Sequence, residues 1–401
     1  MTNRPPHKVV VMGSMCRLPV AGVVYQILHY MVGLERLGFE TYYVEWHGNW
    51  FEDPTVAPGD AHGGRVVIAD VMERFGFGRR WSCRADHVRT GHTFGALDGE
   101  ALKRLYADAA AVLNVTGAHF MEDDMLACPR RVYVETDPGI PQIRVDRGDP
   151  SMKRLLDGHT HLFTFAQNFG NQGCHLPATE LDYRTTRQPV VLDLWREDEC
   201  DSGQAFTTIA RWRKPKEKAV EFRGDTYRWN KDGEFLRFVD LPRLSRQPFE
   251  LALSEIRDDE RTRLEQSGWR VIDAIGLSSS LDAYRRYIGG SRGEFTIAKD
   301  QYVRLNSGWF SDRSACYLAA GRPVVTEDTA FGCALPTGEG LFAFRTLDDA
   351  LGALEEIERD YRRHADAARE IAREFFDADR VLRELMQSVG LECAPARVET
   401  R

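Results

Sequence analysis

The sequence predicts an α/β protein in which two doubly wound domains follow one another along the chain. Three observations indicate this. The 401 residues exceed what one hydrophobic core usually supports. Short apolar runs of the kind that form buried parallel strands recur in both halves, and amphipathic stretches with helical spacing separate them. We therefore expect two sheets that face one another across a cleft, followed by a C-terminal helical stretch.

The first predicted domain, residues 1–196, opens with a complete β-α-β unit. An apolar run over 7–14 predicts the first strand, apolar residues recur with helical spacing over 23–37, and residues 41–45 predict the second strand. The later predicted elements are a helix over 102–109 and strands over 111–115, 131–135 and 161–165. Residues 48–92, rich in Gly, Arg and His, interrupt this alternation and are predicted to be an insertion.

The second predicted domain, residues 204–380, follows a polar linker over 196–203. Its predicted strands lie at 205–210, 235–239, 269–273, 293–298 and 323–326, and a helix is predicted from Ser311. A charged amphipathic stretch over 346–386, interrupted near 375–377, predicts structural helices at the C-terminus. Residues 381–401 are assigned to a C-terminal tail.

Composition and charge restrict the partners. A net charge of −8 argues against a broad nucleic-acid interface, which needs clustered Lys and Arg. The eight cysteines include no Cys-x-x-Cys pair, so we expect a reduced, metal-free protein. No apolar run approaches the roughly 20 residues of a membrane span, and we expect a cytoplasmic protein. A monomer and a homodimer both remain open.

The stretch over 307–325 carries the clearest functional signal, since it predicts a loop, a helix and a strand. Ser311 is a good N-cap and Asp312 lies in the first turn, so free backbone N–H groups point toward the preceding loop. Arg313 and Ser314 add a guanidinium and a hydroxyl there, which favours binding of a diphosphate. The alternative is a purely structural capped helix.

Here the sequence resembles a family. The runs SGWFSDRSACYLAAGRPVV, TEDTAFGCALPTGEGLFAF and LDDALGALEEIERDYRRHADAAREIA are similar to the donor-binding half of GT-B glycosyltransferases, particularly a largely uncharacterised bacterial group. The runs VYVETDPGIPQIR, HLFTFAQNFGNQGCHLP, RQPVVLDLW and GEFTIAKDQYV fit the same pattern, so the resemblance spans about 110–385. It implies two tandem Rossmann-like domains in the GT-B arrangement, with the donor held by the second.

The sequence also departs from that family. The commonest retaining enzymes carry two glutamates with seven residues between them around this helix, where Gly308 and Cys316 stand here. The His-Gly-Gly motif of many natural-product enzymes is absent as well. We therefore expect an inverting, metal-independent transfer without a further cofactor. The resemblance does not specify the nucleobase, and we expect a sugar nucleotide of UDP or dTDP type as co-substrate.

The expected donor-binding residues cluster after strands of the second domain. Lys299 and Arg211 could neutralise phosphates, and Glu294 could accept ribose hydroxyls. In the family, acidic residues of the matching loop bind sugar hydroxyls; we assign this role to Asp328, and the adjacent Glu327 is the alternative. The alternative for several of these side chains is that they are ordinary polar residues on the protein surface. The full expected set is Arg211, Lys214, Glu294, Lys299, Ser307, Gly308, Trp309, Phe310, Ser311, Asp312, Arg313, Ser314, Asp328 and Thr329.

An inverting transfer needs a general base on the acceptor side. Asp137 and His119 follow predicted strands of the first domain and are the candidates. A turn role for Asp137, in Asp-Pro-Gly, and a structural role for His119 are the alternatives. The apolar first loop and a nearby aromatic residue predict a small apolar or aromatic acceptor, as in natural-product biosynthesis. The expected acceptor-binding residues are Met15, Arg17, Leu18 and Trp46.

Two other functions fit the same architecture. A nucleotide-sugar epimerase of GT-B fold would consume its donor without an acceptor. A catalytically silent nucleotide-sugar-binding protein would bind the donor and turn nothing over. The absence of the glutamate pair keeps the second alternative open.

Overall fold

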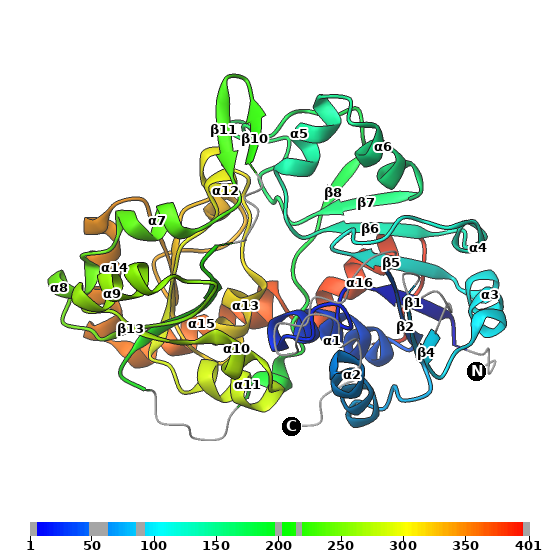
Figure 1. The fold of residues 1–401 in the computed structure, drawn as a ribbon, viewed down its shortest axis with the longest axis horizontal. Helices are drawn as coiled ribbons and strands as arrows, with labels where there is room; N and C mark the ends of the chain where they lie inside the picture. The colour runs from blue at the N-terminus through cyan, green and yellow to red at the C-terminus, as the bar shows by residue number, and fades with distance from the viewer. Residues whose placement is uncertain (1–5, 48–62, 86–92, 197–202, 214–218, 396–401) are drawn as a thin grey trace.

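The computed structural model describes residues 6–47, 63–85, 93–196, 203–213 and 219–395. Two separate sheets, each flanked by helices, lie side by side (Figure 1). The predicted architecture of two doubly wound α/β domains is confirmed. The N-terminal sheet forms what we call the first domain, and the C-terminal sheet forms the second.

The first sheet has the strand order β4-β3-β2-β1-β5-β6-β7-β8. All neighbours pair in parallel except β3 and β4. Every residue of β5 is buried, as are the last four residues of β1, as a sheet covered on both faces requires. The bounds are β1 (Lys8–Met12), β2 (Glu40–His47), β3 (Trp81–Ala85), β4 (Thr93–Gly95), β5 (Ala111–Val115), β6 (Arg131–Glu135), β7 (His161–Thr164) and β8 (Tyr183–Thr185).

The predicted insertion is only partly an insertion. Within residues 48–92, α2 (Gly63–Arg74) and β3 form a regular unit, because β3 pairs in parallel with β2. The remaining residues of that stretch lie outside the described part of the chain. The other helices of this domain are α1 (Ala21–Arg36), α3 (Gly99–Asp108), α4 (Asp123–Leu126), α5 (Ile140–Asp146), α6 (Pro150–Asp157) and the short η1 (Leu192–Trp195).

The second sheet is entirely parallel, in the order β13-β12-β9-β14-β15-β16. A separate hairpin of β10 and β11 projects next to α5 (Figure 1). The bounds are β9 (Phe206–Arg211), β10 (Ala219–Phe222), β11 (Asp225–Arg228), β12 (Phe249–Ser254), β13 (Arg270–Asp273), β14 (Gly293–Thr296), β15 (Val324–Glu327) and β16 (Leu341–Phe344).

The strand predicted over 235–239 is wrong. These residues belong to α7 (Asp232–Arg237) and the turn after it, and the strand next to β9 is instead β12, which the sequence did not reveal. Phe235, Phe238 and Leu241 are buried at intervals of three, which is a helical spacing. The short apolar run over 235–239 hid that period.

The remaining helices cover the second sheet and return to the first domain. Gly33 of α1 faces Leu382 and Ala378 of α16 so closely that an added Cβ would lie 2.5 Å from the leucine. The predicted boundary at residue 380 thus falls inside a helix that packs on α1. The bounds are α8 (Leu241–Leu244), α9 (Asp258–Gln266), α10 (Ala274–Ser278), α11 (Leu281–Gly289), α12 (Asp300–Arg304), α13 (Asp312–Ala319), η2 (Phe331–Cys333), α14 (Leu347–Arg359), α15 (Tyr361–Phe375) and α16 (Ala378–Ser388).

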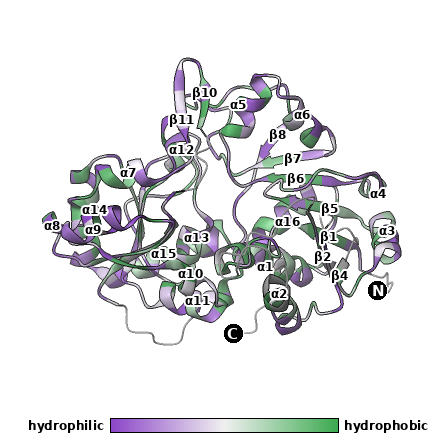
Figure 2. Ribbon diagram, viewed as in Figure 1, coloured by the Kyte–Doolittle hydropathy of each residue, from purple (hydrophilic) through white to green (hydrophobic). Residues whose placement is uncertain are grey.

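The helices carry hydrophobic and hydrophilic residues in alternation, as amphipathic outer helices do (Figure 2). The interruption predicted near 375–377 is confirmed, because α15 ends at Phe375 and α16 begins at Ala378. None of the helices in the described ranges has both the length and the apolar character that a membrane span needs.

Candidate functional site

The two domains meet where strands of both sheets end. Asp137, which follows β6, accepts hydrogen bonds through Oδ1 from Lys299 Nζ at 2.5 Å and from the Tyr302 hydroxyl. Lys299 Nζ also lies 3.7 Å from the centre of the Trp229 ring. The predicted base and a predicted donor cation, 162 residues apart in sequence, are therefore in direct contact across the domains.

The loop before α13 forms the tightest part of this contact. Gly308 has φ +75°, and a Cβ there would lie 2.4 Å from the backbone nitrogen of Asn168 in the first domain. Asn168 N donates to Ser307 O at 3.1 Å, and Trp309 Nε1 donates to Thr136 O at 2.9 Å. The structure thus places this loop against the first domain, rather than around an open phosphate pocket.

The neighbouring predicted donor residues brace that loop. Thr329 is buried, its hydroxyl donates to Trp309 O, and its carbonyl accepts from Gly308 N. Phe310 is buried, and its ring lies against those of Phe331 and Phe376. These side chains hold the loop in place from behind.

The start of α13 differs from the expected anion site. Ser311 occupies the N-cap position as predicted, but within the described residues its side chain makes no capping hydrogen bond. Burial raises the pKa of Asp312 to about 7, and the Gln26 side chain of the first domain hydrogen-bonds to it. Ser314 is fully buried. The first turn therefore faces protein on these sides.

Arg313 is held by its own domain. Its Nε donates to Glu294 Oε1 at 2.6 Å, and its terminal nitrogens donate to Ile209 O at 2.6 Å and Thr296 Oγ1 at 2.7 Å. Strands β9 and β14 pair only through Phe206–Gly293 and Thr207–Glu294, so the guanidinium bridges them beyond the end of their ladder. This corrects the expectation that Arg313 and Glu294 present free groups to the donor.

Three cations lie near the switch point of the second sheet, which is the place between β9 and β14 where the strand order changes direction. We call Lys231, Lys299 and Arg313 the cation group, since the charges of Lys299 and Arg313 act on Lys231. Lys231 Nζ donates to Ile297 O at 2.8 Å, and burial, reinforced by its basic neighbours, lowers the pKa of Lys231 to about 7. Open α/β sheets bind ligands at such switch points, and clustered cations attract anions.

Two further predicted donor residues, Arg211 and Asp328, pair with residues of the second domain. Arg211 is exposed and pairs with Glu255 at 3.4 Å. Asp328 binds Arg345 and the backbone nitrogen of Ala330, while Lys214 lies outside the described residues. Neighbouring Glu327 is buried, and burial raises the pKa of Glu327 to about 7.

A cavity of about 820 Å³ opens over the carboxyl ends of β5 and β6. Helices α5 and α6 and the β10 strand of the hairpin enclose it, and Asp137 and Trp229 line its edge next to Lys299. Its size is within the usual range for small-molecule sites, which is roughly 300–1,000 Å³. The cavity therefore adjoins the cation group through the Asp137–Lys299 pair.

Glu135, the last residue of β6, lines this cavity and was missed from the sequence. It is 1% exposed. Its Oε2 accepts from Gln142 Nε2 and from Thr164 Oγ1 at 2.7 Å, whereas Oε1 has no hydrogen-bond partner among the described residues. Burial raises the pKa of Glu135 to about 8. A glutamate directly after the run Val132-Tyr133-Val134 was the available signal.

Glu135→Gln is expected to stabilise the protein increasingly as the pH rises. The buried glutamate is protonated in the folded state up to about pH 8, whereas in the unfolded chain it ionises near its ordinary pKa of about 4.5. The wild type therefore loses stability relative to the variant between these pH values, by about 1.4 kcal/mol per pH unit at most. Urea unfolding at pH 5, 6, 7 and 8 measures this; a difference independent of pH would contradict it.

His119 lies away from the cavity lining found in the described part of the chain. It is 1% exposed, and its Nε2 lies 2.6 Å from the carbonyl oxygen of Gly13. Asn114 Nδ2 donates to the backbone oxygen of His119 at 2.7 Å. These contacts fit the structural alternative, in which His119 joins the loops after β1 and β5.

The first loop is pinned by a buried glutamate. Glu45 accepts hydrogen bonds from Cys16 N at 2.7 Å, from Arg17 N at 2.8 Å and from the Tyr43 hydroxyl. Met15 is fully buried, so it cannot line an open acceptor wall, while Arg17, Leu18 and Trp46 are half-buried. In the described residues the 820 Å³ cavity is lined by none of the four.

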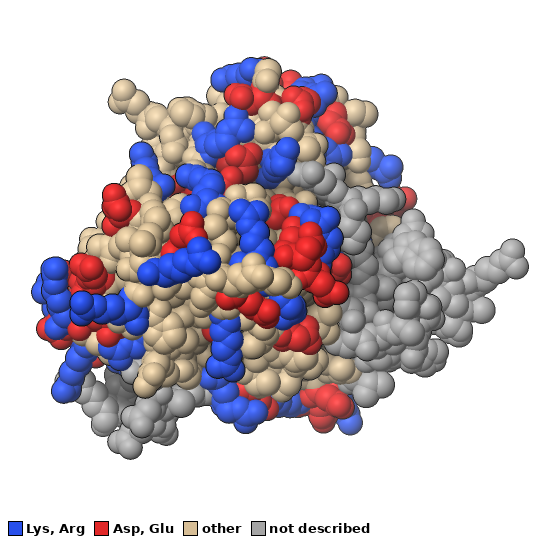
Figure 3. Space-filling model, turned by 60° about the vertical axis from the view of Figure 1, so that its left-hand side comes forward, with Lys and Arg blue, Asp and Glu red and all other residues tan. Residues whose placement is uncertain are grey.

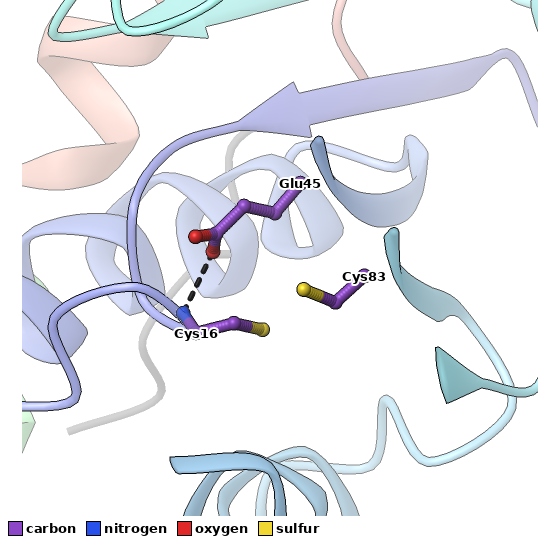
Figure 4. A group of neighbouring side chains, drawn as sticks. All are labelled: Cys16, Glu45 and Cys83. Atoms are coloured by element: carbon purple, nitrogen blue, oxygen red, sulfur yellow. Dashed lines mark hydrogen bonds between the residues drawn. The ribbon is translucent and has the colours of Figure 1, made fainter. Parts of the chain in front are cut away.

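Cys16, Glu45 and Cys83 form a group whose ligand atoms lie within 4.8 Å of one another, and the two thiols face each other (Figure 4). Such a set could hold a thiophilic metal. The carboxylate, however, already accepts the loop's backbone N–H groups, which explains its burial without an ion.

Acidic and basic side chains are interspersed over the face of the molecule seen in Figure 3. That face shows no continuous basic stripe of the kind a polynucleotide needs.

Comparisons with known proteins identify the fold. No protein-family model and no curated protein matches the sequence. Among solved structures, AviGT4, a glycosyltransferase involved in avilamycin A biosynthesis, is 12% identical with a TM-score of 0.53, and the match covers 96% of this chain and 97% of AviGT4. An alpha-glucosyltransferase in complex with UDP and a 13-mer DNA is 10% identical with a TM-score of 0.57, covering 96% and 100%.

HepE of Anabaena, in complex with UDP and glucose, is 9% identical with a TM-score of 0.53, covering 96% of this chain and 99% of HepE. At sequence identities this low, the structural similarity to these proteins shows the fold alone. This chain has the two-domain GT-B arrangement of these glycosyltransferases, which confirms the fold that the sequence resemblance implied.

Proposed function

We propose that this chain is a glycosyltransferase that moves a sugar from a nucleotide-diphosphate sugar, of UDP or dTDP type, to a small apolar or aromatic acceptor in the cytoplasm. The observation that carries the proposal is the cation group at the switch point of the second sheet, beside a ligand-sized cavity between the first domain and the β10–β11 hairpin. Several structures of the same fold are described as complexes with UDP, which supports a nucleotide donor.

In the proposed reaction the donor diphosphate lies against Lys231 and Lys299. Its negative charge raises the pKa of Lys231 again, so both lysines are charged and stabilise the departing group. Lys299 now pairs with Asp137, so a bound diphosphate competes for the lysine and releases the carboxylate. Asp137 then takes the proton of the acceptor hydroxyl. The acceptor oxygen bonds to the anomeric carbon as the bond to the diphosphate oxygen breaks, with inversion, and the electron pair leaves on the diphosphate.

This account assigns no step to a metal. Two lysines and a proton-accepting carboxylate supply the charge stabilisation and base chemistry that an inverting transfer requires. Activity that persists in excess chelator would support the assignment, and activity restored only by an added divalent ion would overturn it.

UDP or dTDP is expected to raise the melting temperature by several degrees, whereas NAD is not, since no Gly-x-Gly-x-x-Gly follows the first strand. A ligand at a hundred times its Kd stabilises the folded state by about 2.7 kcal/mol. Lys299→Met should reduce the shift. Lys103→Met, which removes an exposed lysine of α3, serves as the matched control. A larger response to NAD than to UDP would contradict the proposal.

A further inference from the structure

The cavity over β5 and β6 contains one buried polar atom that the protein leaves unsatisfied. Glu135 holds two donors on Oε2, from Gln142 and Thr164, so this carboxyl group is fixed in orientation. Its Oε1 has no partner within the described residues, although the residue lines the cavity. A buried polar oxygen without a partner is costly, and native structures rarely keep one without a function.

The protonation state of Glu135 restricts which ligand groups can form a hydrogen bond with it. Desolvation raises the pKa of Glu135 to about 8, with a smaller contribution in the same direction from Asp137. At neutral pH the carboxyl is therefore mostly protonated and offers one donor or acceptor to a partner without full charge. A hydroxyl group matches this, because it can donate and accept. Another carboxylate or a phosphate would add repulsion from the ionised fraction and from Asp137.

The other residues that line the cavity indicate what kind of ligand body fits there. Beside the polar floor the walls carry Ile140, Pro141, Met152, Leu155 and the ring of Tyr133. Arg144, which also lines the cavity, is engaged by Asp149 at 2.8 Å. Arg147 lines it as well and donates to Glu221 O at 3.2 Å. The cavity thus combines an apolar side with several polar groups, which suits a ligand that has an apolar body and a polar end.

We propose that Glu135 binds a hydroxyl group of the acceptor and that the acceptor is a neutral hydroxyl compound with an aromatic or apolar body, such as a phenol. Only the statement that the ligand is the acceptor rests on the proposed function. Binding of a hydroxyl compound in the cavity does not depend on it. Glu135 orients the hydroxyl at the edge where Asp137 stands, and Asp137 keeps the role of proton acceptor.

The test is a binding comparison between 4-phenylphenol and biphenyl, by calorimetry at pH 7. The wild type should bind the phenol about tenfold more tightly, since biphenyl has no oxygen to accept a hydrogen bond from the protonated carboxyl of Glu135. Glu135→Ala should remove most of the difference by weakening the phenol alone. Glu135→Gln should retain it, because the amide oxygen can keep Gln142 and Thr164 while the NH₂ group donates to the phenol oxygen.

Leu155→Ala is the control, since it removes apolar wall and should weaken both ligands alike. Equal affinities for the two compounds in the wild type, or a preference for the phenol that stays undiminished in Glu135→Ala, would overturn the inference. The melting temperature of each variant shows whether it is folded, and Glu135→Leu, which keeps more of the side-chain volume and has no polar group, replaces the alanine variant if that one is not. UDP binding and transfer from UDP-glucose are measured separately; their failure refutes the proposed function and leaves the cavity result standing.

Discussion

Arg313→Ala should lower the free energy of unfolding by about 3–5 kcal/mol, the range for breaking a buried ion pair from one side. Glu294 is fully buried, and the side chain of Arg313 is 14% exposed, so the remaining carboxylate keeps no compensating charge at that position. The Ile209 carbonyl and the Thr296 hydroxyl lose their donors as well. Urea unfolding followed by circular dichroism measures the loss.

Two further variants make this result interpretable. Arg313→Met combined with Glu294→Gln removes both charges and should recover much of the stability, because no charge stays buried alone. Arg359→Ala removes an exposed pair with Glu356 on α14 and should change stability by no more than about 0.5 kcal/mol. If Arg313→Ala were instead nearly neutral for stability and weakened UDP binding, the guanidinium would face the diphosphate, as the sequence suggested.

Much of the fold could be predicted because buried parallel strands leave a direct trace in the sequence. The strands over 8–12 and 111–115 are apolar except for Lys8 and Asn114, and they were found within a residue or two. The prediction failed where the spacing of apolar residues fitted both a strand and a helix. Residues 235–239 have the composition of a strand, but their buried aromatic residues are spaced for a helix. Only the packing of Phe238 against Phe344 and of Phe235 against Trp212 settles their form.

The location of the site was predictable, whereas its contacts were not. Residues that follow parallel strands meet at one edge of a sheet, so Asp137 and Lys299 could each be assigned to the cleft. That they bind one another depends on how two domains dock, about which local sequence says nothing. The same holds for Arg313. Its place in the first turn of a capped helix suggested a free guanidinium, but Arg313 binds groups of β9 and β14 beyond the end of their ladder.

The burial of several glutamates was not predicted. Glu45, Glu135, Glu294 and Glu327 all lie on strands, and all four are at most 1% exposed, although Glu294 was expected to present its carboxylate to the donor. A carboxylate in such a place must have partners or a shifted pKa. Two of them hold protein groups with both oxygens, whereas Glu135 and Glu294 each keep one oxygen that has no partner in the described ranges.

Asp137→Asn is expected to slow transfer by 10²–10⁴-fold while it leaves the affinity for UDP within a few-fold, because removing a general base typically costs that much. The asparagine keeps the shape of the side chain and can still accept from Lys299 and Tyr302. Donor binding should even tighten slightly, since the diphosphate no longer competes with a carboxylate for Lys299. Steady-state transfer and calorimetric UDP binding separate the two effects.

The controls decide between the base, a turn residue and other functions. Asp146→Asn makes the same change on exposed α5 and should leave the rate unaltered, whereas His119→Ala should mainly cost stability, because that ring packs against Gly13. A loss below about tenfold in Asp137→Asn, together with a large loss in His119→Ala, would transfer the base to His119. Donor consumed at full rate without any acceptor would instead identify an epimerase. Because Asp137 contacts Lys299, only the combination of slow transfer with unweakened donor binding distinguishes a proton acceptor from a residue that merely positions the lysine.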